Sequence, residues 1–329
     1  MAIKVGMMSF AHLHAMSYAA SLNELPTAEF VGIADHDAAR AAQMAAQFGA
    51  KAFGSYEELL ASDVQAVVVA SENVRHRELV EMAARAGKHV LCEKPLATTL
   101  ADGRAMIDAC QSAGVQLMTA FPCRFSPATE RLKASLEQGR IGSILAIRGT
   151  NRGRCPFDWF VDKSLSGGGA VIDHTVHVTD LIRWLTGKEV VEVYAETSNR
   201  MFHREFEDIG FLTLGLEGGL FATLDASWSR PKSFPTWGDV TMAVVGENGT
   251  LYLDLFSQNL VLYSDKTGGT TWHPWGSNVD TLMLSAFVEA VAEGKPVPIT
   301  GEDGLRAAEV ALAAYRSADA AEPVALPLS

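Results

Sequence analysis

A carboxylate and an imidazole stand at helical spacing near the middle of the chain, at Asp173 and His177. Residues four apart on a helix share a face, so both side chains point the same way. An imidazole titrates near neutral pH and can take the proton of an alcohol as hydride leaves the carbon. The carboxylate can orient the ring or bind a neighbouring hydroxyl. The spacing therefore indicates proton-transfer chemistry, with a solvated polar helix face as the alternative interpretation.

A lysine follows an expected strand at Lys94, directly before Pro95. The proline fixes φ and holds the turn, and ligands of open α/β sheets bind outside the carboxyl ends of the strands. A lysine there is a compact cation that can hold a hydroxyl oxygen and favour its deprotonation. We expect Lys94 to contact substrate, whereas the alternative is an ordinary surface lysine.

A glycine loop of reduced form follows the first expected strand, in residues 6–11. Dinucleotide folds favour G-x-G-x-x-G at this place. Gly6 is kept, Met8 replaces the second glycine, and Ala11 is a tolerated replacement for the third. The following helix still offers N–H groups and a positive dipole end to a diphosphate. The motif alone is a weak indication of a nucleotide site.

An acidic residue ends the second expected strand at Asp35, 29 positions after Gly6. A carboxylate there accepts hydrogen bonds from the adenosine ribose hydroxyls and repels a 2′-phosphate. Asp35 therefore predicts NAD, with NADP disfavoured. The alternative role is a turn or N-cap residue ahead of the next helix.

A metal site is an alternative interpretation of Asp173, His174 and His177, with His203 as a further ligand. Successive helix residues point about 100° apart, so Asp173 and His174 diverge. The four cysteines include no C-x-x-C pair. We therefore expect no metal, and stoichiometric zinc or manganese in the purified protein would contradict this.

The first 120 residues alternate short apolar runs with alanine-rich helical patterns. The expected strands are residues 3–6, 29–34, 66–70, 89–92 and 115–118, and the expected helices are residues 11–22, 37–48, 75–86 and 101–112. Such alternation predicts a Rossmann-type, doubly wound parallel α/β sheet with right-handed crossovers.

Longer strands follow residue 121 and predict a C-terminal α+β domain with a large, mostly antiparallel sheet. Its expected strands are residues 144–150, 190–197, 209–217, 220–228, 240–245, 250–256 and 260–263, and its expected helices are residues 128–138, 169–185, 279–292 and 303–318. The turn at residues 217–219 indicates a hairpin. We expect residues 1–120 to bind the dinucleotide and residues 121–329 to bind substrate and form subunit contacts.

Composition excludes several classes of protein. The chain has 329 residues, 27 Lys and Arg, 39 Asp and Glu, a net charge of −12, and 48% hydrophobic residues. Its negative charge argues against nucleic acid as a partner, and no apolar stretch of about 18 residues predicts a membrane span. Four unpaired cysteines and an N-terminus that enters a strand at once predict a cytoplasmic protein.

Several motifs in order resemble the Gfo/Idh/MocA family of sugar and inositol oxidoreductases. Glu-Lys-Pro at residues 93–95 follows Ala-Gly-Lys-His-Val, and Gly-Gly-Gly at residues 167–169 precedes Asp173, His177 and Asp180. Residues 63–76, 124–127 and 139–142 are also similar to family segments. The resemblance covers most of the chain and implies a hydride transfer between nicotinamide and a secondary carbinol of a sugar, sugar derivative or cyclic polyol.

The resemblance also implies site residues. The catalytic group is Lys94, Asp173 and His177, with His177 as acid/base, Lys94 as polarising partner and Asp173 as orienting ligand. The cofactor contacts are Gly6, Met8, Ser9, Phe10, Asp35, Ser71, Asn73, His76, Glu93 and Lys94. The substrate contacts are His12, Arg124, Arg152, Trp159, Lys163 and His174. The family often pairs its sheets, so a homodimer or homotetramer is expected.

Two other functions remain open at this point. A ligand-sensing regulatory protein shares the fold, although a sensor has no need of Lys94, Asp173 and His177 together. A lyase or hydrolase that transiently oxidises one carbon with tightly held NAD would use the same residues. Net NADH formation separates the dehydrogenase from the latter.

Overall fold

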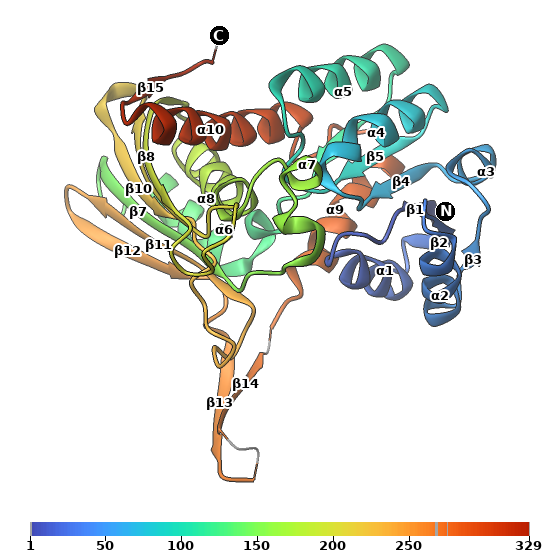
Figure 1. Ribbon diagram of the computed structural model, residues 1–329, viewed down its shortest axis with the longest axis horizontal. Helices are drawn as coiled ribbons and strands as arrows, with labels where there is room; N and C mark the ends of the chain where they lie inside the picture. Colours follow the sequence, from blue (N-terminus) through green and yellow to red (C-terminus); the bar gives the residue numbers. More distant parts are fainter. Residues whose placement is uncertain (1, 267–268, 275, 329) are drawn as a thin grey trace. The chain divides into compact units, whose positions relative to one another are not determined.

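The structure is a computed structural model that describes residues 2–266, 269–274 and 276–328. The chain forms two compact units, each built from segments that are separated in sequence. The first unit contains the chain up to Pro122, Ser164–Gly167 and Val279–Arg306. The second contains Cys123–Lys163, Gly168–Asn278 and the chain from Ala307. Figure 1 traces the elements of both units.

The first unit contains a six-stranded parallel sheet in the order β3-β2-β1-β4-β5-β6. The strands are β1 (Ile3–Met8), β2 (Ala28–Ala34), β3 (Lys51–Ala52), β4 (Ala66–Val69), β5 (His89–Cys92) and β6 (Leu117–Thr119). Its helices are α1 (Ala15–Glu24), α2 (Ala38–Phe48), α3 (Tyr56–Ala61), α4 (His76–Arg85), α5 (Leu100–Ala113) and α9 (Val279–Glu293). The order reverses between β1 and β4, which is where doubly wound folds bind dinucleotides.

Local sequence explains these helices and strands. Strand β4 is fully buried and consists of Ala and Val, as expected for a strand covered on both faces. Asp37 caps α2 by accepting the N–H groups of Ala39 and Arg40. Gly114 ends α5 in the left-handed conformation.

The second unit contains a seven-stranded sheet in the order β12-β11-β7-β10-β9-β8-β15. The strands are β7 (Ile144–Gly153), β8 (Val190–Ser198), β9 (Ile209–Leu216), β10 (Phe221–Asp225), β11 (Gly238–Gly246), β12 (Gly249–Asp254) and β15 (Val324–Ala325). Only β7 and β10 pair in parallel among these described strands. The sheet is therefore mixed and mostly antiparallel, which confirms the predicted fold class.

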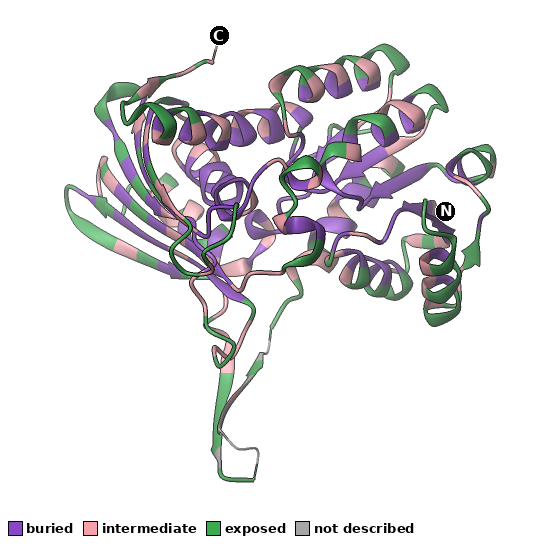
Figure 2. Cartoon of the chain, viewed as in Figure 1, coloured by how far each residue is buried: buried purple, intermediate pink, exposed green. Residues whose placement is uncertain are grey.

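Helices cover one face of this sheet and leave the other open. A hydrophobic core joins the strands to α6 (Pro127–Glu137), α8 (Ala170–Thr186) and α10 (Gly301–Ala320). Along β9 and β10, Leu212, Leu214 and Ala222 are buried, whereas Phe211 and Phe221 are 56% and 52% exposed. Figure 2 shows this alternation of buried and exposed positions along the strands.

A two-stranded hairpin extends from the second unit as a separate sheet (Figure 1). It consists of β13 (Asn259–Ser264) and β14 (Gly269–Pro274). Leu260 and Tyr263 of β13 are 66% and 78% exposed. Because neighbouring residues of a strand face opposite sides, the hairpin exposes apolar side chains on both of its faces.

Several elements differ from the sequence-based expectations. Helix α1 begins at Ala15 because residues 9–14 form a loop, and the two-residue β3 and the short α3 and β15 were not predicted. Residues 279–306 pack with the first unit, which no periodicity indicated. Among the described residues, no helix combines the length and the apolar character that a bilayer crossing requires.

Candidate active site

The loop that follows β1 is anchored to the two neighbouring strands. The Ser9 N–H donates to the Ala34 carbonyl at 2.8 Å, and the His12 N–H donates to the Ala70 carbonyl at 3.0 Å. Gly6 and Met8 precede the loop within β1. Met8 lies in the hydrophobic core, and a β-carbon at Gly6 would lie 2.8 Å from the Leu59 side chain. Met8 at the position of the second glycine therefore points away from the loop.

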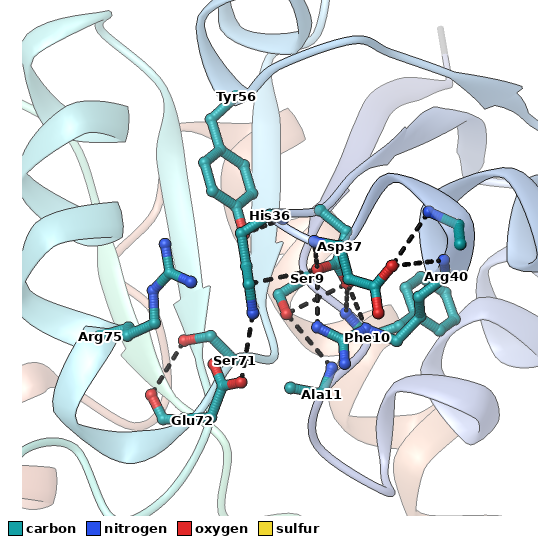
Figure 3. A network of polar contacts seen from close by, with 12 residues as sticks. Ser9, Phe10, Ala11, His36, Asp37, Arg40, Tyr56, Ser71, Glu72 and Arg75 are labelled. Atoms are coloured by element: carbon teal, nitrogen blue, oxygen red, sulfur yellow. Dashed lines mark hydrogen bonds and ion pairs between the residues drawn. The ribbon is translucent and has the colours of Figure 1, made fainter. Parts of the chain in front are cut away.

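The Asp35 carboxylate accepts hydrogen bonds from the loop after β1 and from the start of α2. Its carboxylate accepts the Phe10 N–H at 2.7 Å and pairs with both Nε and Nη2 of Arg40, at 2.8 and 2.7 Å. The Ser9 hydroxyl and the Asp37 N–H add contacts at 3.3 and 2.9 Å. Figure 3 shows Ser9, Phe10 and Arg40 in this network. The carboxylate thus fixes the loop and is charge-balanced by Arg40.

Burial opposes the charge on Asp35, but the Arg40 hydrogen bond and the backbone N–H groups outweigh it. The pKa of Asp35 is consequently lowered. His36 extends the network, because its Nδ1 lies 3.3 Å from Asp35 and its Nε2 lies 3.5 Å from Glu72 (Figure 3). Carboxylates therefore flank His36 from the ends of β2 and β4.

Three predicted cofactor residues follow β4. Ser71 donates to the Glu72 carbonyl, and the Asn73 amide donates to the Ser166 carbonyl at 2.8 Å. His76 opens α4, is fully buried, and has Nδ1 at 3.0 Å from the Pro95 carbonyl. Burial lowers the pKa of His76. A neutral His76 therefore holds the turn that carries Lys94 and Pro95.

Glu93 occupies the centre of a buried cluster. Its Oε1 accepts the Tyr18 hydroxyl at 2.5 Å and lies 2.9 Å from His14 Nδ1 and 3.5 Å from His12 Nδ1. Its Oε2 accepts the Lys94 N–H at 2.8 Å. The carboxylate is fully buried, so it connects the start of α1 to the Lys94 turn.

The Glu93 cluster has strongly shifted titration behaviour. Burial alone would raise the pKa of Glu93, but the charges of His12 and His14 and the His14 hydrogen bond hold it well below its usual range. Burial opposes protonation of His14, yet the Glu93 charge raises the His14 pKa overall. Glu93 is therefore an anion whose charge is balanced by histidine.

The same three side chains could converge on a cation, since the ligand atoms of His12, His14 and Glu93 lie within 4.8 Å of one another. Hydrogen bonds already use those ligand atoms: the backbone N–H of His14 donates to His12 Nδ1 at 3.2 Å, and the imidazole Nδ1 of His14 contacts Glu93. His203, the further ligand in the alternative site of Asp173, His174 and His177, is exposed. The donor geometry therefore supports a hydrogen-bonded cluster.

Lys94 is 4% exposed at the turn after β5. Its position at the carboxyl end of a parallel strand agrees with the position that the sequence predicted. Its backbone is held through Glu93 and its neighbour Pro95 through His76. The structure therefore gives this lysine a fixed backbone in a buried setting.

In the second unit, α8 carries Asp173, His174 and His177. The Asp173 carboxylate accepts the Trp228 indole N–H at 3.0 Å and lies 3.2 Å from His174 Nε2. His177 is 4% exposed, with Nδ1 3.9 Å from the Cys123 thiol. His174 packs edge-on against Trp228 and Trp237. His174 thus supports Asp173 directly.

The two predicted substrate arginines are both in ion pairs. Arg124 is buried and makes a bidentate pair with Asp180 of α8, at 2.8 and 2.5 Å. Arg152 pairs with Asp239 of β11 at 2.9 Å and remains partly exposed. Arg124 therefore fixes α8, whereas Arg152 can still contact a ligand.

Trp159 and Lys163, two of the predicted substrate contacts, lie in neighbouring segments of the chain. Trp159 is buried and stacks on Phe160 with ring centroids 3.9 Å apart. Lys163 begins α7 (Lys163–Ser166) and is exposed. These contacts do not test the substrate role of either side chain, so both roles stay predictions.

Sequence reasoning missed several residues that organise the site. Arg40, Tyr18 and Trp228 were not predicted, although each contacts a predicted residue. Arg40 lies five residues after Asp35 and is the one with a local signal. The partners of Glu93 and Asp173 come from distant segments and carry no such signal.

Comparison with known proteins identifies the class. Residues 3–121 match the oxidoreductase family with an NAD-binding Rossmann fold, and residues 129–252 match the GFO/IDH/MocA C-terminal domain. The chain belongs to the Gfo/Idh/MocA oxidoreductase family, which confirms the resemblance. It is accordingly an enzyme that works with a nicotinamide dinucleotide.

Individual relatives agree over nearly the whole chain. Myo-inositol 2-dehydrogenase of Thermotoga maritima is 30% identical, covering 94% of each chain. 1,5-Anhydro-D-fructose reductase of Ensifer adhaerens is 31% identical, covering 88% of this chain and 89% of the relative. The structure of GenD2 from gentamicin A biosynthesis, in complex with NAD, has a TM-score of 0.91 at 26% identity, covering 99% and 97%.

The residues of the first unit fit such a cofactor. The loop after β1, Asp35 at the end of β2 and Ser71 after β4 meet at the carboxyl edge of the sheet, beside the strand-order reversal. The Asp35 carboxylate already accepts N–H and O–H donors there. Exchanging such donors for ribose hydroxyls requires no new charge.

Proposed function

We propose that this enzyme moves hydride between nicotinamide and a secondary carbinol carbon of a sugar, sugar derivative or cyclic polyol. The observation that carries the proposal is the arrangement on α8, where His177 and Asp173 share a helix face and Asp173 is held by Trp228. The inositol and anhydrofructose relatives support a polyhydroxylated substrate.

In the oxidation direction the carbinol C–H electron pair leaves as hydride and the O–H proton leaves to a base. The bound cofactor supplies the hydride acceptor. We assign proton acceptance to His177, stabilisation of the hydroxyl oxygen to the Lys94 ammonium, and orientation of a substrate hydroxyl to Asp173. Holding the reactants together contributes much of the rate, because oriented groups react as one molecule.

We propose that the cofactor is NAD. Asp35 and Glu72 place carboxylates on both sides of His36, and the added charge of a 2′-phosphate would be repelled there. Arg40 offsets part of this repulsion through its pair with Asp35. Titration of the protein with NADH and NADPH, followed by nicotinamide fluorescence, measures the preference, and tighter NADPH binding would contradict it.

The decisive experiment is a panel of sugars, polyols and inositols with NAD and NADP, followed by nicotinamide absorbance. Net reduction of the cofactor by a polyol supports the proposal. Turnover of a glycoside or other derivative without net NADH would instead assign the lyase or hydrolase chemistry. A known polyol dehydrogenase under the same conditions serves as the assay control.

We further propose a homodimer or homotetramer formed through the open face of the seven-stranded sheet. Phe211, Phe221 and Tyr252 are 56%, 52% and 79% exposed, and exposed aromatic groups of this kind mark contact surfaces. Light scattering measures the mass, and Phe221→Asp should lower it. A monomer at micromolar concentration would contradict the proposal.

We propose that the first unit holds the cofactor, that the second holds the substrate, and that the enzyme works in the cytoplasm. None of the four cysteines, all within the described residues, forms a disulfide, and three of them are buried, as suits a reducing compartment. Fractionation of the source cells with an antibody would test the location.

A further inference from the structure

The helix that carries Asp173 and His177 is held at its start by two residues from elsewhere in the second unit. An α-helix leaves its first N–H groups without partners inside the helix. At α8 the residue before the helix is Gly169, which has no side chain to serve as a cap. Glu207, just before β9, and Tyr315 of α10 supply the acceptors.

Between them these two residues accept the N–H groups of four successive residues. The Glu207 carboxylate accepts from Gly169 at 2.7 Å and from Val171 at 3.2 Å. The Glu207 carbonyl accepts from Ala170 at 3.0 Å. The Tyr315 hydroxyl accepts from Ile172 at 3.1 Å and donates to the Glu207 carboxylate at 2.6 Å.

The glycines before α8 are shaped by the same contacts. A β-carbon at Gly168 would lie 2.0 Å from the Tyr315 hydroxyl, and one at Gly169 would lie 2.2 Å from the Glu207 carbonyl. The glycine run therefore admits the two capping residues. Burial, and then the Glu207 charge, raise the pKa of Tyr315 well above its usual range, so its hydroxyl stays protonated and donates.

Asp173 is the next residue, and its N–H makes the first bond within the helix, to Gly169, at 3.3 Å. The capping contacts end at Ile172, the residue before Asp173, so they set the position of Asp173 along the helix axis. His177 lies one turn further, about 9 Å along the axis from Val171 at 1.5 Å per residue. A shift of the first turn therefore moves both side chains.

We propose that Glu207 and Tyr315 are positioning residues of this oxidoreductase. Tyr315 fixes where the first turn of α8 lies, and the Glu207 carboxylate adds a negative charge at the positive end of the helix dipole. The proposal rests on the assignment of Asp173 and His177 as reacting residues.

Two substitutions separate position from charge. Tyr315→Phe removes the acceptor of the Ile172 N–H but keeps the Glu207 charge. We expect kcat to fall roughly tenfold, with unchanged cofactor KM and an unshifted pH profile. Glu207→Gln keeps an acceptor oxygen but removes the charge. We expect a smaller loss of kcat, because the amide oxygen still accepts the N–H groups of Gly169 and Val171.

The matched controls concern a Tyr–Glu hydrogen bond of 3.2 Å on β8 away from α8: Tyr194→Phe removes the hydrogen bond, and Glu196→Gln removes the charge of its acceptor. Both should keep wild-type kcat and pH profile. Hydrogen exchange of the amides of residues 169–177 provides a readout that needs no substrate. It should accelerate throughout this segment in Tyr315→Phe and stay unchanged in the controls.

The outcomes distinguish this proposal from the proposed function. If Tyr315→Phe accelerates exchange but keeps kcat within twofold of wild type, the positioning role is wrong while the oxidoreductase assignment stands. A loss of kcat in Glu207→Gln as large as that in Tyr315→Phe contradicts the assignment of the positioning role to the acceptor oxygens. If the wild-type protein oxidises no polyol, the proposed function fails. In that case the hydrogen exchange data test the positioning role. If exchange in Tyr315→Phe accelerates only at residues before Asp173, the positioning role is wrong.

Discussion

In the first unit, Asp35 and Lys94 follow the carboxyl ends of parallel strands, whereas in the second unit Asp173 and His177 stand on one helix whose first turn is held by Glu207 and Tyr315. The strand ends are fixed by the sheet itself, because parallel neighbours end at the same edge. The helix depends on contacts from residues 36 to 146 positions away.

The two units also differ in how they balance buried charge. Glu93 and Asp35 are anions neutralised by His14 and Arg40. Asp173 accepts the neutral indole N–H of Trp228 and keeps 13% of its side chain exposed. The fully buried Glu93 carboxylate therefore stabilises structure, whereas Asp35 and the partly buried Asp173 carboxylate are the ones that we propose to contact cofactor and substrate.

The largest expected effect is a loss of turnover without a loss of cofactor affinity. His177→Ala should lower kcat by roughly 10²–10⁴, because general acid–base catalysis contributes about that factor. Cofactor affinity should stay unchanged, since the cofactor contacts are assigned to the first unit. Steady-state kinetics and NADH titration measure the two quantities. Wild-type turnover would remove His177 from the mechanism, and Thr179→Ser on the same helix is a mild control.

Glu93→Gln should next destabilise the first unit, by about 3 kcal/mol, because it leaves His12 and His14 beside an uncharged partner in a buried cluster. Thermal unfolding monitored by circular dichroism measures the loss. Glu57→Gln, an exposed position on α3, is the matched control. Equal midpoints for both variants would show that the Glu93 cluster contributes little.

A smaller effect is expected on cofactor choice. Asp35→Ala should weaken NAD about tenfold, or about 1.4 kcal/mol, because it removes the carboxylate assigned to the ribose. It also frees the Arg40 guanidinium, so the affinity for NADP should fall less than the affinity for NAD, or should rise. Fluorescence titration gives both constants. Arg40→Ala in the same background should remove any gain for NADP, and an unchanged ratio would contradict the role of Asp35.

The smallest expected effect is a pH dependence of stability. The pKa of His14 is raised in the folded protein, so its contribution is complete below the unfolded value of about 6.5 and is lost as pH rises through the folded value. His14→Gln should therefore flatten the decline of the unfolding temperature above pH 6.5. His203→Gln, an exposed histidine, should leave that decline intact.

Much of the fold and part of the site follow from sequence, for a physical reason. Apolar runs of the right length predict strands, and a polar residue at the end of a run, such as Asp35 or Lys94, is expected at the sheet edge. The family, the fold class and the oxidoreductase activity were confirmed. The roles of individual site residues remain predictions.

Contacts between distant segments could not be predicted in the same way. The hydrogen bond from Tyr18 to Glu93 joins residues 75 positions apart, and the one from Tyr315 to Glu207 joins residues 108 apart. A single sequence has no periodic pattern that pairs such residues. The substrate roles of Arg124 and Arg152 came from the family resemblance, which does not reveal their partners Asp180 and Asp239.

The discontinuous first unit has a consequence for the order of synthesis. Helix α9 packs on α1 through hydrogen bonds from Ser17 to Asp280 and between Ser21 and Thr281, and Met118 of β6 forms a bridge with Thr300. A ribosome releases these partners only near the end of translation. The first unit therefore stays incomplete while six of the seven strands of the second sheet are synthesised, and a fragment ending at residue 122 would lack α9.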